Sequence, residues 1–292
     1  MTQTLPLRAR AEHEAARLPP LLARAEHLAG AVLLGEHGRR RSGLGDDFWQ
    51  YRPVQPGDSR RLIDHRRSAK SDTQFVKQRE WQIAQSVMLW VDNAASMRFA
   101  SDKGLPEKAD RAQLLAMSVA ILLNRAGERV GLTGTTLPPR RGEAQIMRLA
   151  DALLNDHDDD YGSPDMRGMP AHGRALLLSD FMGDIAGVKT ALTAAADRGV
   201  QGIVMQVLDP AEEAFPYRGR TIFQSMGGTL AHETLKANDL RDRYLARLAE
   251  RKAELAQLCA MTGWRYQCHH TSDSAQSALL WLYTAIDGGA GA

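Results

Sequence analysis

A short and almost continuously apolar segment, residues 86–91, constrains the fold of this chain more than any other feature, and it ends directly at Asp92. Runs of this length are typical of strands that are buried on both faces, as in the centre of a parallel sheet. Further strand-like segments follow it, at residues 129–135, 175–178, 202–208 and 264–268. Helix-like segments alternate with them, at residues 108–125, 145–154, 185–196, about 240–258 and 275–285. This alternation predicts an α/β fold, a doubly wound, mostly parallel, Rossmann-like sheet with helices on both faces.

The N-terminal part of the chain lacks this alternation. Residues 5–34 are rich in helix-forming Ala, Leu, Arg and Glu, with a break expected at Pro19-Pro20. A Gly- and Arg-rich stretch, residues 35–45, reads as a loop, and β-leaning residues suggest a strand at 75–83. We therefore expect an N-terminal helical and loop extension over residues 1–82 and an α/β domain over residues 83–292.

Composition indicates the compartment and narrows the class of partner. Only two cysteines occur, Cys259 and Cys268, with neither a disulfide framework nor a zinc pattern, which fits a reducing compartment. No apolar stretch approaches the roughly 20 residues that span a bilayer, and the N-terminus shows no secretory signal. The formal net charge of +2 implies no nucleic-acid partner. We expect a cytoplasmic protein without membrane insertion, and Arg39-Arg40-Arg41 remains the only candidate contact for nucleic acid.

Two carboxylates follow predicted strands at the point where each strand ends. Asp92 follows residues 86–91, and Asp180 follows residues 175–178 and Ser179. In an open α/β sheet, ligands bind outside the carboxyl ends of the strands, near the point where the strand order reverses. If these two strands are neighbours, both carboxylates face one crevice.

Asp92 also begins the sequence Asp-Asn-Ala-Ala-Ser, which ends at Ser96. This resembles Asp-x-Ser-x-Ser, the metal-ion-dependent adhesion site of von Willebrand factor A domains, except that Ala94 stands in place of the middle serine. Mg²⁺ prefers oxygen ligands, so a degenerate site of Asp92, Ser96 and Asp180 is expected, with Mg²⁺ as the candidate cofactor and none certain. The alternative is that Asp92 and Ser96 only cap the turn into the next helix.

A set of motifs upstream of this site resembles a known family. Gly43 to Phe48 reads Gly-x-Gly-x-x-Phe, Pro56-Gly57-Asp58 follows, and Ile63-Asp64 precedes Ser68-Ala69-Lys70. These motifs are similar to the signature of the bacterial family catalogued as domain of unknown function 58, with His65 where that family has Trp. The resemblance extends over about residues 35–285 through later positions: Glu80, Ser96-Met97, Ser179-Asp180-Phe181, Asp209-Pro210, Tyr244, Arg251 and Thr271-Ser272-Asp273.

The resemblance implies a von Willebrand factor A-like fold and a partnership with a MoxR-type AAA+ ATPase. Many members are membrane-anchored, whereas this sequence shows no spanning segment. Phosphate-binding loops and nucleophile signatures are absent from the sequence. We therefore expect no enzymatic activity, and interpret the chain as an interaction module or adaptor in protein remodelling or maturation. The alternative is a Mg²⁺-dependent hydrolase that uses Asp92 and Asp180.

Charged residues cluster around the Pro-Gly-Asp turn. They are candidates for contacts with a partner, in which Arg60, Arg66 and Arg67 would meet acidic residues. The alternative is a local network in which Asp58 and Asp64 pair with the arginines beside them, because such turns are often satisfied by their own ion pairs. The cluster comprises Asp58, Arg60, Arg61, Asp64, Arg66 and Arg67.

The adjacent histidines His269 and His270 suggest a metal pair at first sight. Neighbouring residues on a strand point to opposite faces, and no third or fourth ligand is evident in the sequence. We therefore expect ordinary histidines at a strand end.

Overall fold

The computed structural model divides the chain into two compact units. The larger unit contains the helical residues 24–32 together with the sheet and helices that follow residue 85. The smaller unit contains an antiparallel pair of strands, β1 (Phe48–Pro53) and β2 (Phe75–Arg79). The structure describes residues 21–22, 24–32, 48–54, 66, 74–79, 85–135, 138–154, 159–224, 231–234 and 238–287.

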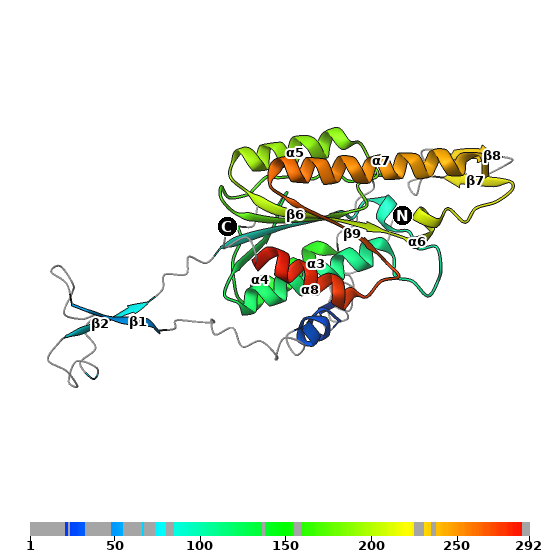
Figure 1. The fold of residues 1–292 in the computed structure, drawn as a ribbon. Helices are drawn as coiled ribbons and strands as arrows, with labels where there is room; N and C mark the ends of the chain where they lie inside the picture. Colours follow the sequence, from blue (N-terminus) through cyan, green and yellow to red (C-terminus); the bar gives the residue numbers. More distant parts are fainter. Residues whose placement is uncertain are drawn as a thin grey trace, which may run out of the picture. The chain divides into compact units, whose positions relative to one another are not determined.

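A five-stranded sheet forms the centre of the larger unit (Figure 1). All of its strand pairs are parallel, and the order is β4-β3-β5-β6-β9. Strand order therefore reverses between β3 and β5, which places the topological switch point there. The strands are β3 (Ser86–Val91), β4 (Arg129–Leu132), β5 (Arg174–Ser179), β6 (Gln201–Leu208) and β9 (Arg265–His270).

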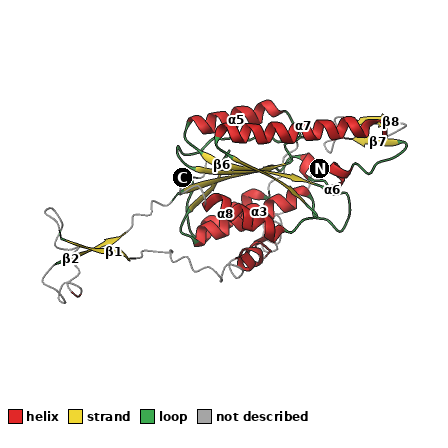
Figure 2. Ribbon diagram, viewed as in Figure 1, coloured by secondary structure: helices red, strands yellow, loops and turns green. Residues whose placement is uncertain are grey.

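Helices cover both faces of this sheet, as Figure 2 shows. One layer contains α3, α4 and α8, and the other contains α5 and α7. The predicted doubly wound α/β fold is therefore confirmed. The helices are α3 (Lys108–Arg125), α4 (Glu143–Leu153), α5 (Ile185–Asp197), α6 (Pro210–Ala214), α7 (Asn238–Thr262) and α8 (Ala275–Asp287).

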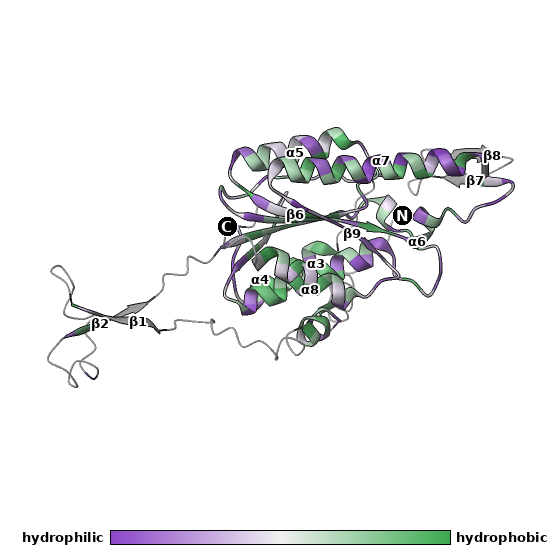
Figure 3. Cartoon of the chain, in the orientation of Figure 1, coloured by the Kyte–Doolittle hydropathy of each residue, from purple (hydrophilic) through white to green (hydrophobic). Residues whose placement is uncertain are grey.

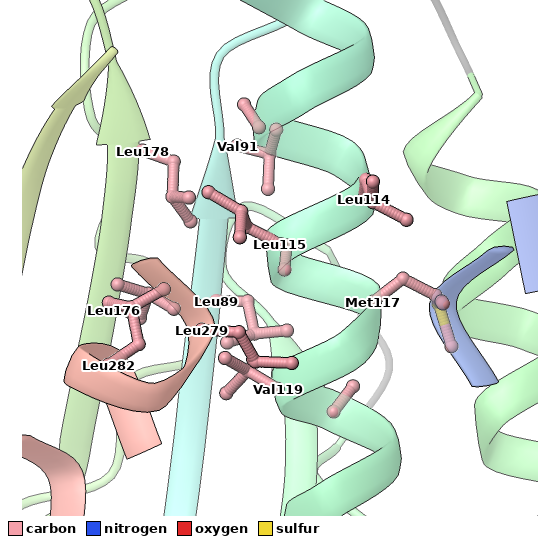
Figure 4. Packing of buried hydrophobic residues seen from close by; sticks show 14 of the residues in the cluster. Leu89, Val91, Leu114, Leu115, Met117, Val119, Leu176, Leu178, Leu279 and Leu282 are labelled. Carbon is pink, nitrogen blue, oxygen red and sulfur yellow. The ribbon is translucent and has the colours of Figure 1, made fainter. Parts of the chain in front are cut away.

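The two core layers follow from the alternation of side chains along each strand. In β5, Leu176 and Leu178 pack into the layer that contains α3 and α8, while Leu177 points to the opposite face. Figure 4 shows the first of these layers, where Leu89 of β3 and Leu115 of α3 meet the β5 leucines. The continuous apolar run at 86–91 is thus explained by burial on both faces.

The helices differ in how much of their surface is buried. Residues 108–123 of α3 are buried with the exception of Asp110, because this helix lies between the sheet and other helices. In contrast, α5 and α7 alternate hydrophilic and hydrophobic residues along their length (Figure 3). This pattern is expected of helices that keep one face in solvent.

The boundary between the two units differs from the one expected. The helical residues 24–32 belong to the α/β unit, since Ala25, Ala29 and Val32 are buried in the same core as α3. The smaller unit spans residues 38–84, so residues 1–82 do not form a single extension. This helix packs closely against the core because the buried residues on one of its faces are small and apolar. The sequence shows this apolar face but does not indicate which part of the chain it packs against.

A further antiparallel pair, β7 (Thr221–Gln224) and β8 (Ala231–Thr234), was not predicted.

Within the described part of the chain, no helix combines the length and the apolar character that crossing a bilayer requires.

Candidate functional site

Asp92 and Asp180 lie at the carboxyl ends of β3 and β5, which are neighbouring strands. The backbone N–H of Asp92 donates to the carbonyl of Leu178 at 2.9 Å, so the pairing of the two strands continues to the edge of the site. Both carboxyl groups are buried, at 2% and 1% exposure. The structure therefore places both carboxylates at the switch point of the sheet.

The Asp92 carboxylate is held by protein donors. Its Oδ2 accepts from the Ser179 hydroxyl at 2.6 Å, and its Oδ1 accepts from the Ala94 N–H at 2.9 Å. Burial raises the pKa of Asp92 above its ordinary value; the Ser179 bond opposes this, and the charge of Asp180 adds to it. Asp92 therefore has the hydrogen bonds of a structural residue that closes the turn after β3.

A loop that follows α4 closes over this turn. The N–H groups of Ala95 and Ser96 donate to the carbonyls of Asp159 and Asp160 at 2.8 and 2.9 Å. Further along the same loop, a Cβ at Gly162 would collide with the Asp92 carboxylate, so only glycine fits there. Asp159 and Asp160 end an acidic stretch that begins at Asp156, and residues 156–158 of it lie outside the described part of the chain.

The Asp180 carboxylate is paired with a buried lysine from α3. Lys108 Nζ lies 2.8 Å from Asp180 Oδ2 and 2.7 Å from Glu212 Oε1. The Lys108 and Asp180 side chains are 2% and 1% exposed, and that of Glu212 is 17% exposed. Burial alone would lower the pKa of Lys108, but the two carboxylates outweigh it and raise this pKa above its ordinary value. Lys108 is therefore a fixed positive charge.

Glu212 is positioned by a capping box at the start of α6. Asp209 Oδ1 accepts from the Ala211 N–H at 2.8 Å, and Glu212 Oε2 accepts from the Asp209 N–H at 2.8 Å. One Glu212 oxygen thus holds the helix start while the other faces Lys108. Burial raises the pKa of Glu212, and the charge of Lys108 opposes this shift.

These residues form the floor of a pocket of about 1040 Å³. Ser96, Lys108, Asp180 and Glu212 line its base. Its walls are rich in aromatic and apolar side chains: Phe99, Tyr161, Met182, Phe215, Tyr217, Leu240 and Tyr244. Helix α7 also supplies charged side chains to the walls, those of Arg243, Arg247 and Glu250.

The aromatic wall is a packed unit. The Phe215 ring lies 5.3 Å from that of Tyr217, edge to face, and 5.0 Å from that of Tyr244. Burial raises the pKa of both tyrosines above the ordinary value, and nearby carboxylates such as Glu212 add to the shift. Both phenols are therefore neutral, and this wall offers an apolar surface with hydroxyl tips.

The residues present do not fit an octahedral Mg²⁺ site. Ala94 supplies no side-chain ligand, and the Lys108 ammonium already contacts Asp180 Oδ2. Ser96 and Asp180 line the large pocket, whereas Asp92 lines a different pocket of about 370 Å³ with Thr133. One observation favours a small ligand: the hydroxyls of Ser96 and Thr133 are buried and have no hydrogen-bond partner among the described residues.

Sequence reasoning missed the residues that define this site. Lys108 is the first residue of a strongly apolar helix, a position where an ammonium is normally solvated. Glu212 belongs to an Asp-Pro-x-Glu pattern, which is a signal for a capping box.

Among the candidate partner contacts, Arg66 is described and exposed. The others lie outside the described residues: Asp58, Arg60, Arg61, Asp64 and Arg67, as does the Arg39-Arg40-Arg41 stretch.

Comparison with known proteins confirms the family resemblance. Residues 50–254 match the model of the family described as "Protein of unknown function DUF58". Uncharacterized proteins of Mycobacterium bovis and Mycobacterium tuberculosis are 27% identical over 241 residues, which is 77% of this chain and 75% of theirs.

Two solved structures are also similar in outline. The first is an aerotolerance-related membrane protein from Bacteroides fragilis, with a TM-score of 0.41, 14% identity, and coverage of 70% of this chain and 100% of that one. The second is the conserved hypothetical protein BatB from Bacteroides thetaiotaomicron, with a TM-score of 0.39, 16% identity and the same coverage of 70% and 100%.

Proposed function

Since the chain belongs to the DUF58 family of proteins of unknown function, we propose that it is a non-enzymatic protein-interaction module. It docks a partner segment in the pocket at the carboxyl end of the sheet, and Lys108 takes the place of a metal ion there. A von Willebrand factor A-like character of the fold is part of this proposal.

The observation that carries the proposal is the ion cluster beneath the pocket. Lys108 contacts two carboxylates at 2.8 and 2.7 Å and is buried with them. An ammonium with a raised pKa is a poor general base, and a carboxylate paired with it is a poor nucleophile. The cluster therefore supports a structural charge at a binding site rather than a reacting group.

The pocket above the cluster has the chemistry of a docking site for protein. Aromatic side chains such as Tyr161 and Tyr244 provide large apolar area, and Arg243 and Arg247 add charged groups from α7. Tyrosine and arginine are among the residues that contribute most to protein–protein affinity. The pocket therefore suits an apolar side chain of a partner segment with polar or charged neighbours.

The family resemblance supports a MoxR-type AAA+ ATPase as the partner. We expect the full chain to retain such an ATPase in co-purification, and Tyr161→Ala to weaken binding by tenfold or more, about 1.4 kcal/mol. Tyr161 is 42% exposed and lines the pocket, so its removal leaves the core intact. Affinity is measured by surface-immobilised titration of the ATPase.

The matched control is Met261→Ala, which removes another exposed apolar side chain, at 76% exposure on α7, outside the pocket. This variant should bind as the wild type does. Failure of the wild-type chain to bind the ATPase would overturn the assignment of the partner. Equal loss in both variants would overturn the assignment of the pocket.

A Mg²⁺-dependent hydrolase that uses Asp92 and Asp180 is the second candidate. Two buried hydroxyls without a hydrogen-bond partner among the described residues favour it, those of Ser96 and of Thr133, which lines a pocket with Asp92. It requires Asp180 to exchange Lys108 for an ion, which a titration with Mg²⁺ can detect.

A further inference from the structure

A second group of potential ligands lies away from the base of the pocket. Glu213, Cys268 and His270 each present one ligand atom, and these atoms lie within 4.8 Å of one another. We propose that they form a binding site for a thiophilic divalent transition-metal ion, with Zn²⁺ as the representative. This proposal is independent of the docking function.

Strand geometry explains how two of the ligands meet. Cys268 and His270 are two residues apart in β9, so their side chains project from the same face of the strand. His269 projects from the other face, where Arg111 Nη1 lies 2.8 Å from its Nε2. The two adjacent histidines therefore do not form a pair, as expected. Instead, His270 shares its face of the strand with Cys268, and both contribute to the cluster.

The third ligand comes from α6. Glu213 Oε2 lies 2.6 Å from His270 Nε2, yet this contact lacks hydrogen-bond geometry, and the buried Nε2 atom has no hydrogen-bond partner among the described residues. An imidazole nitrogen that lies close to a carboxylate without a hydrogen bond between them leaves its lone pair available for a cation that both groups can ligate. Thiolate, imidazole and carboxylate together are a ligand set that Zn²⁺ accepts, with the fourth position open to water.

An acidic residue lies beside the other ring nitrogen of His270, the one that does not face Glu213. His270 Nδ1 lies 3.5 Å from Asp273 Oδ2. A carboxylate beside the distal ring nitrogen favours a proton on Nδ1, which leaves Nε2 free to ligate. The arrangement resembles the carboxylate–histidine pair that commonly accompanies zinc ligands, at a longer distance than a typical hydrogen bond.

Lys252 of α7 competes with a metal ion for the same groups. Its ammonium contacts Glu213 and is hydrogen-bonded to Cys268, and its side chain is 24% exposed. Burial raises the pKa of the Cys268 thiol, and Lys252 opposes this shift. A bound ion would displace both the thiol proton and the Lys252 ammonium, which can turn into solvent.

A loaded site would connect α6 to β9. Glu213 is the neighbour of Glu212, which holds Lys108 at the floor of the pocket. Metal binding would thus fix the helix that carries one partner of the buried lysine. The metal ion would therefore have a structural role, and the proposal includes no catalytic step at this site.

The test is a titration of the full, untagged, chelator-treated chain with Zn²⁺ and, separately, with Co²⁺. We expect one equivalent to bind, with a thiolate-to-cobalt charge-transfer band in the near-ultraviolet spectrum. Glu213→Gln and Cys268→Ala should each remove this binding, and Asp273→Asn should weaken it by about tenfold. Lys252→Ala should tighten it, because the competing ammonium is gone.

Matched controls are Cys259→Ala, which removes the other thiol, and His172→Gln, which removes an exposed histidine. Both should bind Zn²⁺ as the wild type does. Absence of stoichiometric binding, a cobalt spectrum without a thiolate band, or binding that survives Cys268→Ala and Glu213→Gln would overturn the proposal. Glu213 is partly exposed, so its variant tests the site even where the cysteine variant folds poorly.

Discussion

Replacement of Lys108 by methionine is expected to lower the free energy of unfolding by about 3–5 kcal/mol. Methionine fills a similar volume but carries no charge, so Asp180 and Glu212 would be left as two like charges under the pocket. Removing one partner of a buried ion cluster leaves the rest uncompensated, and this costs more than the cluster contributes as a whole. Urea-induced unfolding of the two proteins measures the difference.

The matched controls separate charge from packing. Lys189→Met removes an exposed lysine of α5 and should change the stability by no more than about 0.5 kcal/mol. The triple variant Lys108→Met/Asp180→Asn/Glu212→Gln makes the whole cluster neutral, and it should recover most of the loss. If Lys108→Met alone is as stable as the wild type, the ion cluster is not a structural element of the site.

The protein is also expected to lose about 3 kcal/mol of stability as the pH falls from 6.5 towards 4, through the single side chain His269. Burial lowers the pKa of His269 to about 4, the adjacent Arg111 guanidinium adds to this, and Asp273 opposes it. In this interval the unfolded chain binds a proton that the folded chain excludes. The contribution is therefore complete above pH 6.5 and declines below it.

Comparison with His269→Gln isolates this contribution. Glutamine keeps an acceptor for Arg111 but does not titrate, so the variant should lose less stability on acidification. Asp92 and Glu212 have raised pKa values and contribute in the opposite sense, but they are common to both proteins and cancel in the difference. Parallel curves of unfolding free energy against pH for the two proteins would contradict the assignment.

The fold was predictable because its signals are local. The apolar run at 86–91 and the position of Asp92 directly after it specify a buried strand and its carboxyl end without knowledge of any other segment. The N-terminal boundary of the α/β unit was not predictable in this way. Ala25 and Ala29 form an apolar helix face, and the surface that this face packs against is determined only in the assembled core.

The site was predictable only in part, for the same reason. Asp92 and Asp180 follow strands, so the switch-point rule located them. Lys108 reaches Asp180 and Glu212 from distant parts of the chain, and no local pattern distinguishes it from a solvated lysine. The ligand cluster shows the same limit: Cys268 and His270 share a strand face, but Glu213 joins them only through the position of α6.

In the proposed function, a buried ammonium rather than a metal ion supplies the positive charge at the carboxyl end of the sheet. Its most direct test is the thermal midpoint of the wild-type chain in chelator and in millimolar Mg²⁺. An ion at a concentration of 100 times its Kd would stabilise the native state by about 2.7 kcal/mol. We predict no change in the midpoint. A rise with Mg²⁺ in the wild type that is lost in Ser96→Ala would show instead that a metal ion binds at this site.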